Sequence, residues 1–219
     1  MALDQLISLY SKRDLDFRAN LQPGQVCWTP VCYSNENAEI WRPTQFDYSE
    51  TQATHFQLVA KPSKAYQEAR VIHSPTLEAY EEFPVIRAKQ RPVIILALDP
   101  APISHRPDRM KLDKHLCLVA PYYSTVDALG ISKIQEPILD RIRSLEFPQF
   151  LFLAQSPAMA NDSLLRLDSI FHTYRAHLEP TQWGLSSDAW NIVQGQLEYI
   201  FNGVFGGSFK AARDALQGK

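Results

Sequence analysis

The chain has few cysteines, no long hydrophobic run and no large excess of charge of either sign. Its 219 residues include three cysteines, an odd number that fits free thiols better than a disulfide framework. The longest apolar run, Pro92 to Leu98, has the length of a strand and falls far short of the roughly 18 residues that a membrane span needs. Because Asp4 stands where a secretory signal would be basic, we expect a cytoplasmic protein without a membrane segment.

Common nucleotide-binding and catalytic motifs are also missing. The sequence contains no G-x-G-x-x-G, P-loop, G-x-S-x-G or H-E-x-x-H pattern, and the cysteines have no metal-type spacing with the six histidines. We therefore expect neither a cofactor nor a metal. Cys27, Cys32 and Cys117 are predicted to be core thiols, with a catalytic thiol as the alternative. Cys27 and Cys32 are predicted to lie on opposite faces of one strand.

The charges that are present are unevenly distributed. Lys and Arg total 22 against 24 Asp and Glu, and a net charge of −2 counts against a basic nucleic-acid-binding domain. Residues 34–83 carry four basic and eight acidic side chains, whereas residues 84–118 carry seven basic and three acidic ones. This pattern indicates either a cationic surface with its own counter-charge or solvated faces of mixed sign.

Hydrophobic patterning predicts a mainly β (α+β) chain with helices at both ends. Strands are predicted over 25–33, 55–60, 91–98, 115–121, 147–154 and 163–170, and helices over 2–19 and 137–145. A further helix begins at Ser186 or Ser187 as N-cap and stops at Gly203, with a short tail helix after it. Residues 34–83 contain only one credible strand, so we predict a single domain, 1–219, with an insertion at about 34–85.

Five short segments carry a resemblance to a known family. They are PGQVCW (23–28), RPVIIL (91–96), LVAPYYST (118–125), LLRLDSI (164–170) and LSSD (185–188). In this order they are similar to strand and helix motifs of the MazF/PemK (Kid) family of bacterial toxins. Each match is short, and it is the ordered set that indicates the family.

The resemblance implies an SH3-like antiparallel barrel, usually a homodimer, here with N-terminal and C-terminal helices and an inserted segment. It implies a metal-independent endoribonuclease, an mRNA interferase-like toxin that cleaves single-stranded RNA through the RNA's own 2′-OH and is inhibited by an antitoxin protein. The family usually has a short loop where Cys32 to Lys89 stands here. We hypothesise that this acidic insertion covers the RNA groove and competes with RNA, with a decorative subdomain as the alternative.

The resemblance also implies catalytic residues. Arg91 matches the family's active-site arginine, and a permanently charged guanidinium suits the stabilisation of a phosphorane. Arg166 and Asp168 match its R-x-D pair and would project from one face of a strand, Asp168 as a base or its orienter and Arg166 as a donor or phosphate clamp. A surface ion pair is the alternative. Tyr123 stands at the family's Thr position and Ser124 at the following Ser, as candidate hydroxyls.

A second group of residues is predicted to contact RNA around this site. The candidates are Arg87, Lys89, Thr125, His172 and Arg175. An unperturbed imidazole has a pKa near about 6.5, so His172 is also a candidate acid or base.

Two other functions stay open because a fold does not fix a function. The first is a non-catalytic module of the same fold that binds a protein or a nucleic acid. The second is a toxin that acts on a protein target, as the gyrase poison CcdB does on a similar fold.

Overall fold

The structure, a computed structural model, describes residues 3–13, 20–33, 39–47, 52–58, 83–98 and 116–218. The chain divides into two compact units. The first combines Met1–Val31 with Gln90–Lys219, and the second is Cys32–Lys89.

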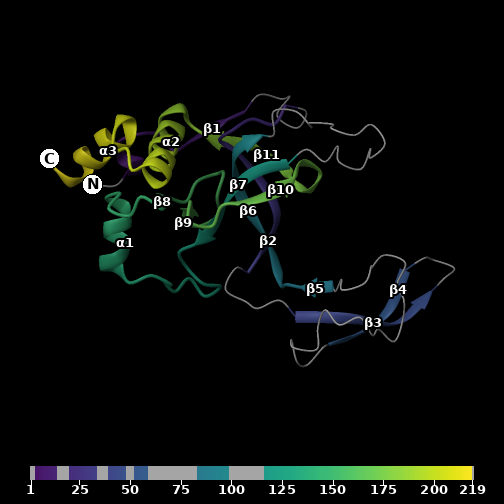
Figure 1. The fold of residues 1–219 in the computed structure, drawn as a ribbon. Helices are drawn as coiled ribbons and strands as arrows, with labels where there is room; N and C mark the ends of the chain where they lie inside the picture. Colours follow the sequence, from purple (N-terminus) through teal and green to yellow (C-terminus); the bar gives the residue numbers. More distant parts are fainter. Residues whose placement is uncertain are drawn as a thin grey trace. The chain divides into compact units, whose positions relative to one another are not determined.

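The first unit is built on an eight-stranded sheet (Figure 1). Its strands are β1 (Tyr10–Lys12), β2 (Gln25–Cys32), β6 (Ala88–Leu98), β7 (Leu116–Ser124), β8 (Phe150–Leu153), β9 (Ser163–Arg166), β10 (Phe171–Tyr174) and β11 (Glu179–Leu185). Its helices are α1 (Glu136–Arg143), α2 (Ser187–Asn202) and α3 (Gly207–Gln217), with short 3₁₀ turns η1 (Leu3–Gln5) and η5 (Arg175–His177). No helix among the described residues is long and apolar enough to cross a membrane.

The strand order is β1-β11-β2-β6-β7-β9-β8, with β10 pairing β7 off this path. The first part of β7 pairs antiparallel with β10 and its last part with β9, so β7 holds both short strands. The prediction of a mainly β chain is confirmed. In the described residues β1 and β8 end the path without pairing with each other, so the observed sheet is open.

The centre of the sheet is buried on both faces. Ile94 and Leu96 of β6 belong to a core cluster that also contains residues of α2 and α3. Val93 and Ile95 point the other way, into a second cluster with Val119 of β7. Alternate side chains of one strand therefore enter two different cores, which explains why this segment is a continuous apolar run. The prediction of buried strands at 91–98 and 115–121 is confirmed.

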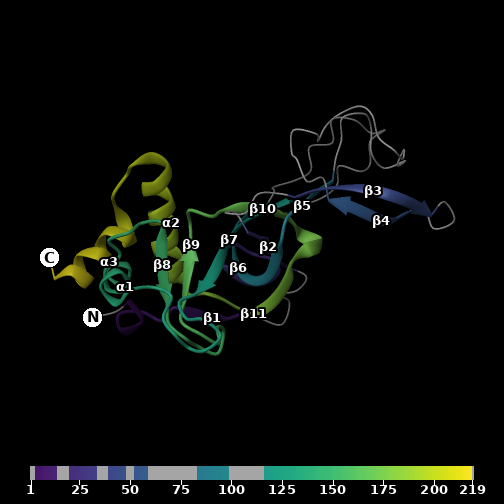
Figure 2. The same cartoon turned by 90° about the horizontal axis from the view of Figure 1, so that it is seen from below.

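The two C-terminal helices cover one face of the sheet, and Figures 1 and 2 both show them side by side. Helix α2 begins where predicted, because Oγ of Ser186 accepts a hydrogen bond from the Ala189 amide at 3.1 Å. It ends at Gly203, whose φ of 70° is the left-handed conformation that glycine adopts without strain. The predicted tail helix is α3, and its Phe209 is fully buried in the core.

Helix α1 confirms the prediction over 137–145 and packs against one face of β9 and β8, the last two strands of the sheet path. Its Leu139 and Ile142 form a third cluster with Phe152 of β8 and Leu164 of β9. Two residues after the helix, Leu145 has a φ of 57°. This conformation is unfavourable for any residue with a Cβ, and here it directs the Leu145 side chain into the main core, where only 1% of it is exposed.

Two other element predictions are wrong. The predicted N-terminal helix is replaced over the described residues by η1 and by β1, in which Tyr10 pairs with Leu185 of β11, while residues 14–19 lie outside the described part. Pairing along a sheet edge has overridden the helical spacing of the apolar residues. The strand predicted over 163–170 ends at Arg166 and is followed by a turn.

The cysteine predictions are partly confirmed. Cys27 and Cys117 are buried thiols that form no disulfide, and burial raises the pKa of Cys27 to about 12, aided by the nearby Cys117. Cys32 is exposed, so the prediction that all three lie in the core is wrong. Burial alternates along β2, and the odd spacing puts Cys27 and Cys32 on opposite faces as expected.

The second unit contains an antiparallel sheet of order β4-β3-β5. Its strands are β3 (Glu39–Asp47), β4 (Gln52–Leu58) and β5 (Phe83–Val85). Strand β4 overlaps the strand predicted over 55–60. The rest of the acidic segment, residues 34–38, 48–51 and 59–82, lies outside the described residues.

Two buried tyrosines make the stability of the fold sensitive to alkali. Tyr10 and Tyr122 interact with each other, but neither hydroxyl makes a hydrogen bond of good geometry with a described residue. Burial raises the pKa of both phenols above the ordinary value of about 10. Above that pH the unfolded chain loses these protons first, so their contribution to stability is present below about pH 10 and is lost as pH rises.

We therefore expect Tyr122→Phe to resist alkali better than the wild type. At neutral pH the change should alter the free energy of unfolding by no more than about 1 kcal/mol, because no well-formed hydrogen bond is removed. Urea midpoints at neutral pH and above about pH 10 would measure the difference, with Tyr174→Phe, an exposed tyrosine, as the control. An equal alkaline loss in wild type and Tyr122→Phe would contradict the assignment.

Candidate active site

Three neighbouring strands bring two arginines to one tyrosine. Arg91 comes from β6, Tyr123 from the end of β7 and Arg166 from the end of β9. The guanidinium carbon of Arg91 lies 4.4 Å from the Tyr123 ring centroid, and that of Arg166 lies 5.2 Å from it. Each cation–π contact of a partly exposed pair is worth about 0.5–1 kcal/mol. We call these three residues the arginine–tyrosine cluster.

The register of the sheet explains why Arg166 meets Tyr123. Tyr123 is paired with Leu164 of β9, and Arg166 lies two residues beyond Leu164. Side chains two apart on a strand point to the same face, so Arg166 shares the face of Tyr123.

Arg166 is held in place by Asp168. Its Nε donates to Oδ1 of Asp168 at 2.9 Å and its Nη2 donates to Oδ2 at 2.7 Å, while the Ser169 hydroxyl also donates to Oδ1 at 3.3 Å. The predicted association of Arg166 with Asp168 is therefore present, although Asp168 lies in the turn after β9 and not on the strand. The hydrogen bonds to Asp168 raise the pKa of Arg166 against the opposing effect of partial burial, so it stays a cation.

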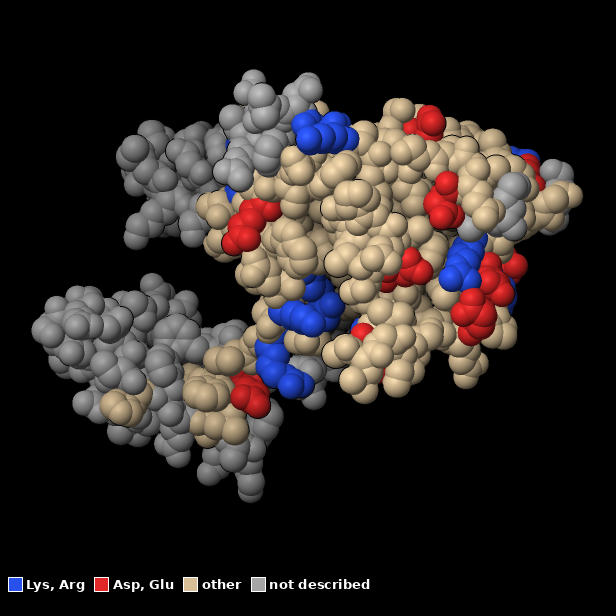
Figure 3. Space-filling model, turned by 180° about the vertical axis from the view of Figure 1, so that it is seen from behind, with Lys and Arg blue, Asp and Glu red and all other residues tan. Residues whose placement is uncertain are grey.

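The charge at the cluster is local. The side chains of Arg166 and Asp168 are 31% and 33% exposed, which leaves part of each accessible to a ligand. On the face seen in Figure 3, basic and acidic residues form small separate patches on a largely uncharged surface. A ligand at the cluster would meet the fixed guanidinium of Arg166 at short range.

The hydroxyls that follow Tyr123 serve the turn after β7. Oγ of Ser124 donates to the Val126 carbonyl at 2.8 Å, and Ser124 as the next residue points to the opposite face from Tyr123. Thr125 is 2% exposed and donates through Oγ1 to the Asp162 carbonyl at 3.0 Å. The structure thus gives both side chains a role in the turn, and Thr125 offers no accessible surface to RNA.

His172 and Arg175 do not join the cluster. His172 of β10 pairs with Leu118, five residues before Tyr123 and about 16 Å away along β7. Because five is odd, His172 shares the face of Leu118 and not that of Tyr123. Arg175 follows in η5, farther along the chain in the same direction.

Arg87 and Lys89 belong to the second unit, Cys32–Lys89, and are exposed there. The Arg87 guanidinium carbon lies 5.7 Å from the ring centroid of Tyr33, whose amide donates to the Arg87 carbonyl at 2.9 Å. These contacts join the two ends of that unit. Neither residue is assigned to the arginine–tyrosine cluster of the first unit.

One neighbour of the cluster was missed by sequence reasoning. Phe150 of β8 is paired with Arg166, and its ring centroid lies 5.8 Å from the Arg166 guanidinium carbon. The aromatic residues of 147–154 were visible in the sequence, but the face that each would occupy depends on the register. Among the described residues no group of His, Cys, Asp and Glu is arranged to hold a metal ion.

No protein-family model, curated protein or solved structure matches this chain. The arginine–tyrosine cluster combines residues from three of the segments that resemble the family, RPVIIL, LVAPYYST and LLRLDSI.

Proposed function

We propose that this chain is a metal-independent endoribonuclease that cleaves single-stranded RNA in the manner of the MazF/PemK toxins. The observation that carries the proposal is the arginine–tyrosine cluster. Its residues Arg91, Tyr123 and Arg166 come from three separate segments that resemble the family, and all three meet within cation–π distance. A solvated surface ion pair between Arg166 and Asp168 alone would not require Arg91 at the same ring.

The cluster supplies the groups that RNA transesterification needs. The 2′-OH attacks the adjacent phosphorus, the bond to the 5′-oxygen breaks, and a 2′,3′-cyclic phosphate and a 5′-OH end result. Arg91 and Arg166 neutralise the charge of the phosphorane. Asp168 has acceptor capacity beyond its three hydrogen bonds and takes the 2′-OH proton, while the Tyr123 hydroxyl protonates the leaving 5′-oxygen.

The proposal includes the other properties that the resemblance implies. They are an SH3-like barrel arrangement of the sheet, a homodimer and control by an antitoxin protein. The antiparallel pairing of β6, β7 and β9 around the cluster supports the first of these. A cytoplasmic location, which Asp4 in the N-terminal segment led us to expect, is proposed with them.

The test is incubation of the purified full-length protein with a long single-stranded RNA in EDTA. We expect cleavage that leaves 2′,3′-cyclic phosphate and 5′-OH ends. Tyr123→Phe keeps the ring and its contacts with both arginines but removes the proposed acid, so kcat should fall about 100-fold. Tyr174→Phe, an exposed tyrosine on β10, is the matched control and should cleave normally.

Each alternative outcome has a clear meaning. Full activity of Tyr123→Phe would remove Tyr123 from the mechanism. If the protein binds RNA without cleaving it, the proposed ribonuclease activity is rejected and a non-catalytic module is favoured. If it neither binds nor cleaves RNA, RNA is rejected as the ligand.

A further inference from the structure

A series of contacts between aromatic rings and guanidiniums continues beyond the arginine–tyrosine cluster. Arg166 contacts Phe150, and the ring of Phe150 lies 6.4 Å from that of Phe147, centroid to centroid, at an interplanar angle of 57°. The Arg141 guanidinium carbon then lies 4.7 Å from the Phe147 centroid. We call Phe150, Phe147 and Arg141 the aromatic track.

The track lies on the same face as the cluster. Phe150 is paired with Arg166, so the two side chains point the same way from β8 and β9. Helix α1 packs on this face through the cluster that contains Leu164, and it thereby brings Arg141 to Phe147. Phe147 and Phe150 are only half-buried, and the Arg141 side chain is 56% exposed. Part of each group is therefore open to a ligand.

The charges of the track are already compensated. The Nε of Arg141 donates to Oε2 of Glu146 at 2.7 Å, just as Arg166 is held by Asp168. The hydrogen bond from Arg141 lowers the pKa of Glu146. With guanidiniums and carboxylates in balance, the track has little long-range attraction for an anion. A ligand must bind it mainly through flat groups that stack on the rings, with a negative group placed beside a guanidinium.

A single strand of RNA has this chemistry, because unpaired bases alternate with phosphates along it. We propose that the aromatic track binds the nucleotides that flank the scissile phosphate, with bases stacked on Phe150 and Phe147 and a phosphate at Arg141. The inference rests on the proposed function, since Arg166 belongs to both the cluster and the track.

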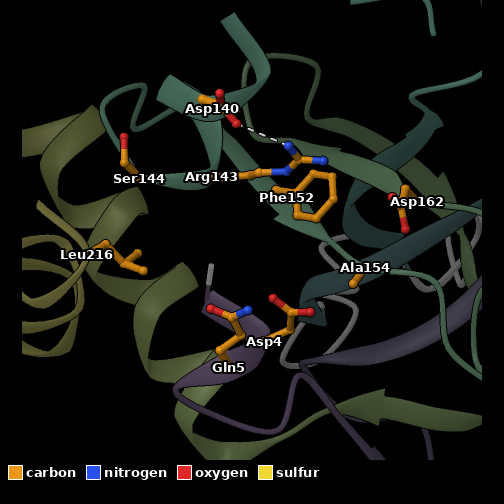
Figure 4. A pocket seen from close by; sticks show the side chains of 9 residues that line it. All are labelled: Asp4, Gln5, Asp140, Arg143, Ser144, Phe152, Ala154, Asp162 and Leu216. Atoms are coloured by element: carbon orange, nitrogen blue, oxygen red, sulfur yellow. Dashed lines mark hydrogen bonds and ion pairs between the residues drawn. The ribbon is translucent and has the colours of Figure 1, made fainter. Parts of the chain in front are cut away.

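A cavity beside α1 is unsuited to bind the RNA strand. A cavity of about 630 Å³ opens beside α1 and is shown in Figure 4. Its lining includes Asp4, Asp140 and Asp162, with Arg143 lying against Phe152 and bonded to Asp140. Three carboxylates against one paired guanidinium disfavour phosphate there. We therefore place the end of the proposed binding path at Arg141 and not in this cavity.

The test compares two substrates of the full-length protein, a long single-stranded RNA and a trinucleotide that reaches little beyond the scissile phosphate. Phe147→Leu keeps apolar packing but removes the flat ring. Its loss of kcat/KM on the long RNA should exceed its loss on the trinucleotide by about 10-fold, a typical value for one stacked base. Phe201→Ala, a 66% exposed phenylalanine at the end of α2, is the control and should lose nothing on either substrate.

A gain of affinity provides a second measurement. Glu146→Gln removes the carboxylate that occupies Arg141, so a long RNA with a 2′-deoxy residue at the cleavage position should bind about threefold more tightly by fluorescence anisotropy. Arg141→Ala should weaken the same binding, and Lys210→Ala, which removes a surface cation paired with Asp214, should not.

The outcomes distinguish a failure of RNA binding by the track from a failure of the proposed ribonuclease activity. If Phe147→Leu loses equal kcat/KM on both substrates, or none on either, the proposal that the track binds the flanking nucleotides is overturned. If the wild type cleaves neither substrate, the proposed function fails. The anisotropy of the uncleavable strand then tests RNA binding by the track independently of cleavage. Unchanged binding in both Glu146→Gln and Arg141→Ala would overturn the proposal that the track binds RNA.

Discussion

Replacing Arg91 with alanine is expected to lower kcat/KM for RNA cleavage by about 1,000-fold. Arg91 lies 4.4 Å from the Tyr123 ring and supplies one of two guanidiniums that would face the phosphorane. Removing a fixed donor from a developing oxyanion typically costs about 100- to 1,000-fold, and here a full positive charge is lost as well. Initial rates on a fluorogenic oligoribonucleotide with EDTA present would measure the effect.

Two further variants separate a catalytic role of Arg91 from a structural one. Arg91→Lys keeps the charge but loses the planar, bidentate geometry, so it should recover only part of the activity. Arg213→Ala removes a guanidinium of α3 that lies 5.0 Å from the ring of Phe205, between α2 and α3. This contact is of the same kind but away from the cluster, so the variant should retain activity. Wild-type rates in a folded Arg91→Ala protein would remove the cluster as the site of cleavage.

Replacing Phe209 with alanine is expected to lower the free energy of unfolding by about 3–5 kcal/mol. Phe209 is 0% exposed, and its ring lies 5.3 Å from that of Phe205 and 6.2 Å from that of Tyr199. Truncating such a side chain loses its burial and leaves a cavity between α2, α3 and the sheet. Urea unfolding would measure the loss. Phe201→Ala, 66% exposed, should change stability by less than about 0.5 kcal/mol.

Gly195 provides a check that the cost of Phe209→Ala comes from packing between the helices. A Cβ built at Gly195 of α2 would lie 2.7 Å from Cβ of Phe209, so glycine allows α3 to approach this closely. Gly195→Ala should therefore destabilise the protein despite the better helix propensity of alanine. Because alanine retains its Cβ, adding Gly195→Ala to Phe209→Ala should still cost stability, and an undiminished or increased stability would contradict this packing.

The sheet was predictable where hydrophobic residues are consecutive, and the N-terminal segment was not. The run around Val93–Leu96 must be a strand buried on both faces or a short core helix, and its length favours the strand. Around Leu3 and Tyr10 the apolar spacing fits a helix equally well, yet Tyr10 pairs with Leu185, a residue 175 positions away. A single sequence contains no signal for a pairing partner at that distance.

The candidate site was predictable only where the motifs themselves carry it. Arg91 and Arg166 were found through the resemblance and do meet at Tyr123. The position of His172 depends on the register of β10 against β7, and the burial of Thr125 depends on the turn after β7. Local residue type determines neither. The aromatic track could not be predicted for the same reason, because it depends on the register that pairs Phe150 with Arg166.

The left-handed turn at Leu145 is expected to give the two parts of the proposed RNA site separate stabilities. A φ of 57° is unfavourable for leucine, so the turn persists only while its side chain stays buried in the main core. We expect a local opening that exposes Leu145 to release α1, and with it Arg141 and Phe147, before the pairing of β6, β7 and β9 around Tyr123 is lost. The opening free energy of the α1 region, which would bind a long RNA strand, should then be lower than that of the sheet around the proposed cleavage centre. The amides of α1 should therefore exchange their hydrogens before those of β7.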